Sequence, residues 1–316
     1  MNPRSAGEAQ GLWAITSYFN PVGYRHRLAN YRIFREYLKV PLVTVELAYG
    51  PDFELGEGDA DILVQLRGTD VMWQKERLLN IALKALPDGC SKVAWLDCDI
   101  VFEKDEWADH LSAKLDTFMI VQPFDQAHHL LRDRAPDEIT ERDVGLSQTS
   151  IVCAINSGRP LRSVLSQLVD RTRGTFAGFA WSARREVLDS HAFYDACIIG
   201  GGDTAFVFAA CGLAEDVARL HSMNDRQKDR YLEWASRFHA AASGSVSHIP
   251  GDLFHLWHGQ IADRRARERH ERLSLFGFDP YADITINENG PWQWASSKPE
   301  LHAYLKAYFA GRKEDG

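Results

Sequence analysis

The chain has 316 residues, with 36 Lys and Arg against 44 Asp and Glu, so its formal net charge is −8. At about 150 residues per domain, this length predicts two domains or one large α/β domain with additions. Hydrophobic residues make up 45% of the chain and charged residues 25%, which excludes wholesale disorder. The acidic balance argues against a protein whose affinity depends on neutralising nucleic-acid phosphates or an anionic membrane surface.

Cysteine usage and hydropathy bear on where the protein works. The five cysteines are scattered and form no CxxC pair, which favours reduced thiols over a disulfide framework. No stretch approaches the roughly 18 uncharged apolar residues of a membrane span, and the N-terminal residues lack a signal-peptide layout. We therefore expect a cytoplasmic protein with no membrane span and no nucleic-acid partner.

Strands and helices alternate in the first part of the chain. Apolar residues at helical spacing predict helices over residues 25–38 and 71–86. Short apolar or β-branched runs predict strands over residues 12–18, 43–45, 92–96 and 118–121. This alternation is typical of a mainly parallel sheet covered by helices, a layout common among nucleotide-binding proteins.

The remaining segments suggest a division of the chain into parts. Residues 1–10 are small and polar and predict a flexible tail, which precedes a first half over residues 11–126. A charged, histidine-rich stretch that contains Pro136 predicts a surface excursion over residues 127–147. A second half follows over residues 148–260, and a charged helix with an aromatic-rich extension over residues 261–316.

Two carboxylates follow the expected strand over residues 92–96. Asp97 and Asp99 stand two residues apart at its carboxyl end, which is the edge of a parallel sheet where ligands bind. Two carboxylates on a short turn can hold Mg²⁺ or Mn²⁺, which keep open positions for the oxygens of a diphosphate. The alternative is structural, with Asp99 capping a helix and Asp97 lying in a turn.

Two histidines, His255 and His258, lie in an aromatic segment near the end of the second half. One imidazole could supply a nitrogen ligand to the ion held by the two acids, and a nitrogen ligand would favour Mn²⁺ over Mg²⁺. The alternative is a hydrogen-bonded core histidine, because a ligand role requires the fold to bring the ring to Asp99.

A run of three glycines precedes a single acid in Gly200-Gly201-Gly202-Asp203. A backbone without side chains lets a substrate approach closely and meet one carboxylate, so Asp203 is a candidate general base. The alternative is a turn in which Asp203 caps a helix over residues 204–211. Upstream, Trp181 is suited to stacking on a sugar ring, although a tryptophan is more often a core residue.

Two groups of basic residues could meet a phosphate. Lys75 and Arg77 lie in the expected helix over residues 71–86, where each could contact a nucleotide diphosphate or form a surface salt bridge. Residues 264–272 place opposite charges four residues apart, which predicts a solvated helix from which an arginine could still reach a phosphate.

In their order along the chain, these segments resemble the metal-dependent GT-A glycosyltransferases, with the closest likeness to the β-1,4-galactosyltransferase type. The resemblance covers about residues 12–272. It rests on Lys75-Glu76-Arg77-Leu78-Leu79-Asn80, Trp95-Leu96-Asp97-Cys98-Asp99-Ile100, the stretch over residues 178–186, Gly201-Gly202-Asp203, and His255 or His258. It implies a Rossmann-like mixed sheet flanked by helices, with a donor half over residues 11–126, an acceptor half over residues 148–260 and a C-terminal extension.

The resemblance also implies roles for individual residues. Asp99 would bind the ion directly, Asp97 would help to hold the ribose or the ion, and His258 would be the third ligand, with His255 as the alternative. The nucleobase would lie near Tyr18, Asn20 and Arg25, and the acceptor near Trp181, Gly201, Gly202 and Asp203. The family has further acids after its glycines, whereas Thr204 and Ala205 follow Asp203 here, so the assignment of the base depends on one residue.

The expected reaction is the transfer of a sugar from a UDP-sugar to a hydroxyl acceptor on a glycan, a peptide or a small molecule. Mn²⁺ or Mg²⁺ would neutralise the departing diphosphate, and Asp203 would take the acceptor proton, with inversion at the anomeric carbon. Two alternatives stay open. Asp97 and Asp99 also fit the nucleophile motif of a HAD-type phosphohydrolase, and the acids could be structural in a non-catalytic sugar- or nucleotide-binding module.

Overall fold

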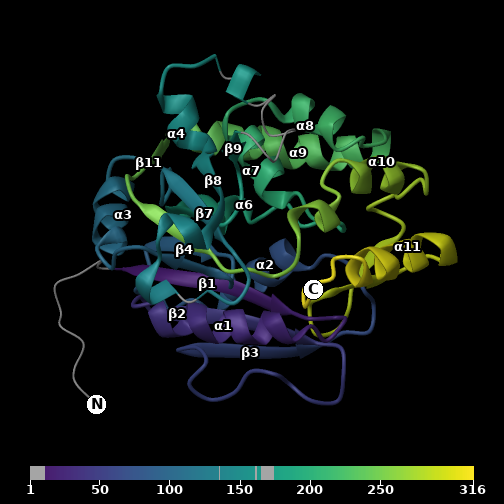
Figure 1. The fold of residues 1–316 in the computed structure, drawn as a ribbon. Helices are drawn as coiled ribbons and strands as arrows, with labels where there is room; N and C mark the ends of the chain where they lie inside the picture. Colours follow the sequence, from purple (N-terminus) through teal and green to yellow (C-terminus); the bar gives the residue numbers. More distant parts are fainter. Residues whose placement is uncertain (1–10, 135, 161, 165–173) are drawn as a thin grey trace.

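The computed structural model describes residues 11–134, 136–160, 162–164 and 174–316 (Figure 1). The tail expected over residues 1–10 lies outside the described residues. Strands of the described part assemble into a seven-stranded, a five-stranded and a two-stranded sheet. Helices flank the largest sheet, so the expected mixed α/β architecture is confirmed.

The seven-stranded sheet has the order β11-β6-β10-β4-β1-β2-β3. Its strands are β1 (Leu12–Phe19), β2 (Leu42–Ala48), β3 (Ile62–Arg67), β4 (Lys92–Leu96), β6 (Ile120–Gln122), β10 (Ala180–Arg184) and β11 (Val246–His248). β4, β1, β2 and β3 pair in parallel, and β10 runs antiparallel to both β4 and β6. The carboxyl ends of β1 and β4 therefore lie at the same edge of the sheet.

The helices in the described residues range from short turns to one of 18 residues. They are α1 (Arg25–Tyr37), α2 (Lys75–Ala85), α3 (Trp107–Leu115), α4 (Ile151–Asn156), α6 (Arg185–His191), α7 (Gly202–Ala210), α8 (Ala214–Leu220), α9 (Asp225–Ala242), α10 (Glu268–Ser274) and α11 (Pro299–Ala310). Short 3₁₀ turns span Pro136–Glu138, Glu141–Asp143 and Ile261–Arg264. None of the helices in the described ranges is long and apolar enough to cross a membrane.

Hydrophobic cores lie on both faces of the large sheet, because successive side chains of a strand point to opposite faces. Ala14 of β1 belongs to the core that contains Tyr31 and Phe34 of α1. The next residue, Ile15, belongs to the core that contains Leu79 of α2. The buried strands are therefore mainly apolar, as parallel strands covered on both sides are, although Thr16 and Ser17 of β1 and Thr44 and Glu46 of β2 are buried as well.

The five-stranded sheet corrects part of the expectation of a surface excursion over residues 127–147, because two of its strands take up the two ends of that range. Its order is β5-β12-β7-β8-β9, formed by β5 (Ile100–Phe102), β7 (Gln126–Leu130), β8 (Val144–Ser150), β9 (Thr175–Phe176) and β12 (Asp252–His255). β7 is an interior strand that pairs with β12 and β8, and His129 within it is buried. Sequence patterns missed this strand because most of its residues are polar. In the fold, hydrogen bonds to neighbouring strands and side chains satisfy its buried polar groups.

Two further differences concern the first part of the chain. The helix expected from residue 71 begins at Lys75, because the residues before it bond elsewhere. The Trp73 amide donates to Ile198 O, and the Gln74 side chain donates to Trp292 O. Sequence patterns also missed β3, whose side chains are mostly half-buried or exposed because it forms the edge of the sheet.

The last residues pack on the main body. β13 (Ile284–Ile286) and β14 (Trp292–Trp294) form the two-stranded antiparallel sheet. Leu301 and Leu305 of α11 are fully buried in the core that contains α2 and α7. The Tyr24 hydroxyl donates to Phe309 O and Ala310 O and accepts from the Lys313 amide, so the end of α11 and the residues after it lie close to the carboxyl end of β1 (Figure 1).

Candidate active site

A cavity opens at the carboxyl edge of β1 and β4, where ligands bind in open α/β sheets. Residues from distant parts of the chain share its wall. They are Ser17, Phe19, Arg27, Trp73, Lys75, Asp97, Cys98, Asp99, Thr175, Phe176, Ala177, Gly178, Phe179, Gly201, Asp203, Thr204, His255, His258, Arg264, Arg269 and Arg312. The cavity therefore brings together the two acids after β4, Asp203 and both candidate histidines.

Strand pairing explains how Asp99 meets the histidines. Asp99 directly precedes β5, which pairs antiparallel with β12 so that His255 stands opposite Ile100. The amide of Leu256 then donates to Asp99 O over 2.8 Å, and the chain turns back within three residues to present His258. A backbone ladder of β-sheet type thus fixes the approach of both imidazoles to the carboxylate.

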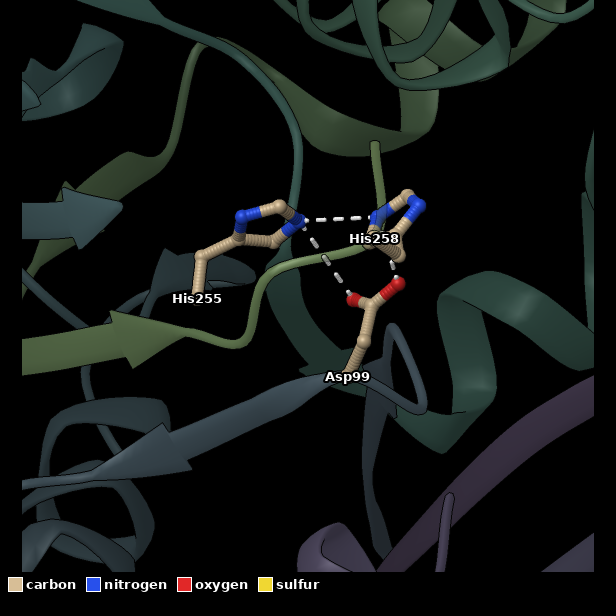
Figure 2. Close-up of side chains that lie close together, drawn as sticks. All are labelled: Asp99, His255 and His258. Carbon is tan, nitrogen blue, oxygen red and sulfur yellow. Dashed lines mark hydrogen bonds and ion pairs between the residues drawn. The ribbon is translucent and has the colours of Figure 1, made fainter. Parts of the chain in front are cut away.

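The side chains of Asp99, His255 and His258 point toward one another (Figure 2). His258 Nε2 lies 3.0 Å from Asp99 Oδ2, and His255 Nε2 lies 3.9 Å from Asp99 Oδ1. All three ligand atoms lie within 4.8 Å of one another. The structure thus places both histidines with Asp99, where the sequence left a choice between them.

These three residues fit a divalent transition metal. Asp99 Oδ1 is buried and has no hydrogen-bond partner among the described residues, so one carboxylate oxygen is available to an ion. Burial alone would raise the pKa of Asp99, but His258, His255 and Arg27 outweigh it and hold that pKa well below its usual range. Burial lowers the pKa of His255, which keeps the ring neutral, as a ligand must be. One oxygen and two nitrogens suit Mn²⁺ or a later ion better than Mg²⁺.

Asp97 points away from this group and toward Lys75. Lys75 Nζ lies 2.5 Å from Asp97 Oδ1 and 2.9 Å from Asp203 Oδ2, so one buried ammonium joins the two acids. Burial would lower the pKa of Lys75, but Asp203 and Asp97 raise it well above its usual range. Burial raises the pKa of Asp97 to about 6, with Asp203 and Asp99 adding to the effect and Lys75 opposing it.

The glycines before Asp203 are required by close contacts. Gly201 has a φ of +98°, and a Cβ on it would lie 2.7 Å from His221 Cε1. A Cβ on Gly202 would lie 1.9 Å from Glu76 Oε1. A side chain at either position would displace a buried group, so these two glycines let α7 begin against α2 and present Asp203 to the cavity.

Several sequence-predicted residues lie outside the cavity, which corrects the roles expected for them. Trp181 is 0% exposed and its indole N–H donates to Ala177 O, so it is a core residue and cannot stack on a sugar. Arg25 is 90% exposed and pairs with Asp315. Arg77 pairs with Asp195 and donates to Gly290 O.

Tyr18 and Asn20, which were expected near the nucleobase, form hydrogen bonds with Glu54 instead. Tyr18 is buried and its hydroxyl donates to Glu54 Oε2 over 2.7 Å. The Asn20 side-chain amide also donates to Glu54, and its oxygen accepts from the amides of Gly23 and Tyr24. Neither side chain is part of the cavity wall, so their contacts in the structure are those of a structural turn after β1.

Four arginines on the cavity wall were missed or misplaced by sequence patterns: Arg27, Arg264, Arg269 and Arg312. The run over residues 264–272 is not the solvated helix expected from its charge pairs. Arg269 is 5% exposed, Arg264 contacts His258, and only Arg267 and Arg272 form exposed pairs of the expected kind. No local signal marks Arg27 or Arg312, because only the tertiary fold brings them to the cavity.

Comparisons with known proteins give likenesses at the level of solved structures. No family model matches the sequence, and no curated protein matches it. The chain is similar to S. aureus TarS in complex with UDP-GlcNAc, at 13% identity and a TM-score of 0.38, over 62% of this chain and 52% of that one, about half its length. It is similar to a Drosophila β1,4-galactosyltransferase 7 variant in complex with manganese, UDP-Gal and xylobiose, at 10% identity and a TM-score of 0.38, over 93% of this chain and 98% of that one. It is similar to the mannosyltransferase PcManGT from Pyrobaculum calidifontis in complex with GDP-Man and Mn²⁺, at 15% identity and a TM-score of 0.35, over 97% of this chain and 88% of that one.

Proposed function

We propose that the protein is a metal-dependent glycosyltransferase that moves a sugar from a nucleoside diphosphate sugar, with UDP as the nucleotide, to a hydroxyl acceptor. The observation that carries this proposal is the group formed by Asp99, His255 and His258 at the carboxyl edge of the sheet. A buried group of one carboxylate and two imidazoles in a cavity rich in arginine suits a metal ion and an anion together.

Asp99, His255 and His258 would hold a divalent ion, with a preference for Mn²⁺ over Mg²⁺ because two of the ligands are nitrogens. The ion supplies positive charge against the departing diphosphate when it is bound. Asp99 contributes its ionised carboxylate and His255 a neutral ring, the protonation states that ligation requires. Asp97 pairs with Lys75 and is not one of the proposed metal ligands.

Asp203 is the proposed general base. Its carboxylate lies on the cavity wall and is held by Lys75 Nζ at 2.9 and 3.1 Å. Lys75 would fix the orientation of the Asp203 carboxylate. The carboxylate would take the proton of the acceptor hydroxyl as that oxygen attacks the anomeric carbon from the face opposite the diphosphate, which gives inversion.

The acceptor is a hydroxyl on a glycan, a peptide or a small molecule. Thr175, Phe176 and Gly178 line the same cavity as Asp203. Phe176 and Phe179 stack with ring centroids 4.2 Å apart, and Phe176 is half-buried. With Trp181 in the core, Phe176 and Trp73 are the half-buried aromatic rings on the cavity wall, and we assign the acceptor contact to Phe176.

The decisive experiment measures thermal stabilisation of the purified protein by UDP, GDP, ADP and CMP, each with Mn²⁺ and with a chelator. Ligand at about 100 times its dissociation constant adds about 2.7 kcal/mol to stability, which is a visible shift in Tm. We expect the largest shift with UDP and Mn²⁺, followed by sugar transfer from a UDP-sugar to an acceptor panel. Absence of a shift with every nucleotide, or release of phosphate from a simple phosphoester, would contradict the proposal.

A further inference from the structure

Two arginines on the cavity wall have no carboxylate partner. Arg264 and Arg269 both line the cavity, yet no carboxylate oxygen of the described residues lies within 4.0 Å of either guanidinium. Arg269 is 5% exposed, and the Nε atom of Arg264 is buried without a hydrogen-bond partner in that same part of the chain. Charges withdrawn from solvent are normally paired, so the buried Arg269 and the half-buried Arg264, which face one cavity without a carboxylate partner, indicate a site for an anion.

The two guanidinium groups contact side chains other than carboxylates. Arg264 Nη2 donates to His258 Nε2 over 2.9 Å. Arg269 Nη1 donates to the Tyr308 hydroxyl over 2.7 Å, and a Cβ on Gly200 would lie 3.4 Å from both of its Nη atoms. Tyr308 of α11 thus fixes Arg269 without neutralising it.

The other two arginines show that this wall accepts an oxyanion. Arg27 Nε donates to Glu314 Oε2 over 2.7 Å, and Arg312 Nε donates to Glu314 Oε1 over 2.5 Å. Glu314 is 1% exposed, so one buried carboxylate is shared between two guanidinium groups. Arg312 also donates to the Tyr308 hydroxyl, which links this pair to Arg269.

The balance of charge leaves the wall positive. In the part of the chain that the structure describes, Glu314 and Asp99 are the carboxylates on this side of the cavity, against the four cations Arg27, Arg264, Arg269 and Arg312. Asp97 and Asp203 pair with Lys75 on the other side. The excess of positive charge also acts on Tyr308. Burial would raise the pKa of Tyr308, but Arg269 and Arg312 outweigh burial and lower that pKa to about 8. A doubly charged anion would bring the wall close to neutrality.

We propose that Arg264 and Arg269 bind the diphosphate of the nucleotide, and that Tyr308 is the positioning residue that aims Arg269. The inference depends on the proposed function and deepens it, since it assigns the diphosphate to residues of α10, α11 and the turn before them. Planar guanidinium groups bind phosphate oxygens through paired N–H donors, so two of them select a diphosphate over a monophosphate. This recognition acts in addition to a bound metal ion and does not require one.

The test is calorimetric titration with UDP, UMP and inorganic pyrophosphate, all in excess chelator so that the arginines are measured without metal. For the wild-type protein we expect UDP to bind at least tenfold more tightly than UMP, and pyrophosphate to bind by itself. Arg264→Gln and Arg269→Gln should each weaken UDP and pyrophosphate binding about tenfold or more, with a smaller effect on UMP. Arg272→Gln is the matched control, because Arg272 lies on the same helix, is exposed and pairs with Glu268.

Further variants guard against a loss of folding. Arg269→Lys keeps the charge but loses the paired donors, so it should retain part of the affinity. Tyr308→Phe should weaken UDP binding and flatten its pH dependence near pH 8, whereas a merely structural role would change stability alone. Circular dichroism would establish that each variant is folded.

The outcomes separate this inference from the proposed function. Equal affinity of UDP and UMP, or unchanged UDP binding in folded Arg264→Gln and Arg269→Gln proteins, overturns the arginine site even if sugar transfer occurs. Pyrophosphate binding that both variants abolish, in a protein that transfers no sugar, supports the arginine site and contradicts the proposed function.

Discussion

The Nε2 atoms of His255 and His258 lie 3.1 Å apart. Two imidazole nitrogens at this separation cannot both carry a proton, because two N–H groups would then face each other. At least one lone pair is therefore directed into the space between the rings and Asp99. The strand β12 and the tight turn after it produce this arrangement of the two rings. Substitution of either histidine therefore tests whether the group binds a metal ion.

Removal of one ligand should abolish tight binding of the metal. We expect Asp99→Ala, His255→Ala and His258→Ala each to weaken Mn²⁺ binding by more than tenfold, because loss even of groups that only support ligands costs 10- to 100-fold. Titration calorimetry with Mn²⁺ measures this directly. His110→Ala serves as a control, since His110 is exposed on α3. Wild-type Mn²⁺ affinity in all three ligand variants would show that the group does not bind metal.

Asp203→Asn should separate binding from chemistry. Loss of a general base lowers the rate by about 10²–10⁴-fold, whereas an amide of the same shape can still contact Lys75. We expect transfer to fall within this range while UDP affinity stays within about twofold. Asp189→Asn is a control on an exposed acid of α6. A variant at position 203 that transfers sugar at the wild-type rate would exclude Asp203 as the base.

Trp181→Ala should affect stability and leave nucleotide binding unchanged. The side chain is 0% exposed and packs against Phe206, so the substitution creates a large cavity. Such truncations cost roughly 3–5 kcal/mol in the free energy of unfolding, measurable with urea. Leu275→Ala, at an 80% exposed position, should change stability by less than about 0.5 kcal/mol. If Trp181→Ala instead weakened sugar binding at unchanged stability, the core assignment would be wrong.

Glu76 should make the protein less stable as pH rises. Burial raises the pKa of Glu76 from 4.5 to about 8, with Asp203 and Asp97 adding to it, so the folded state keeps a proton that the unfolded state releases. The stabilisation is complete below pH 4.5 and is lost as pH rises to about 8. One group changes the free energy of unfolding by at most about 1.4 kcal/mol per pH unit.

Glu76→Gln provides the measurement for this pH dependence. Glutamine mimics the protonated acid, so its stability relative to wild type should increase steadily between pH 5 and 8 in urea unfolding. Glu186→Gln, at an exposed position of α6, should leave the pH profile unchanged. Parallel profiles for wild type and Glu76→Gln would contradict a neutral buried Glu76.

Sequence patterns predicted β1, β2, β4 and β6 of the large sheet, the helices α1 and α2, and the acids at the edge of the sheet. The strand over residues 92–96 has the expected bounds, because a continuous apolar run between a glycine turn and two acids has few alternatives. The helix over residues 25–38 differs from α1 by one residue. Sequence patterns identified the candidate site residues because each lies at, or within three residues of, the end of a helix or strand. These residues are Asp97, Asp99, Asp203, His255 and His258.

The rest of the site depends on tertiary contacts that no local pattern encodes. Trp181 has the same sequence context as a sugar-binding aromatic residue, and only the packing of α7 against β10 makes it a core residue. Arg264 and Arg269 form part of a charged run that resembles a solvated helix. Arg269 is buried by its contacts with Gly200 and Tyr308, and Arg264 is half-buried beside His258. β7 is polar in sequence, and its pairing with the neighbouring strands β12 and β8 makes it an interior strand.

The ion pair between Arg27 and Glu314 joins residues 287 positions apart. A contact of such high sequence separation forms late, because the chain between its partners must be ordered first. During synthesis the arginine wall stays incomplete until the residues after α11 dock on α1. An anion bound there would tie both segments together, so amide hydrogen exchange in α1 and α11 would slow in concert when the ligand binds.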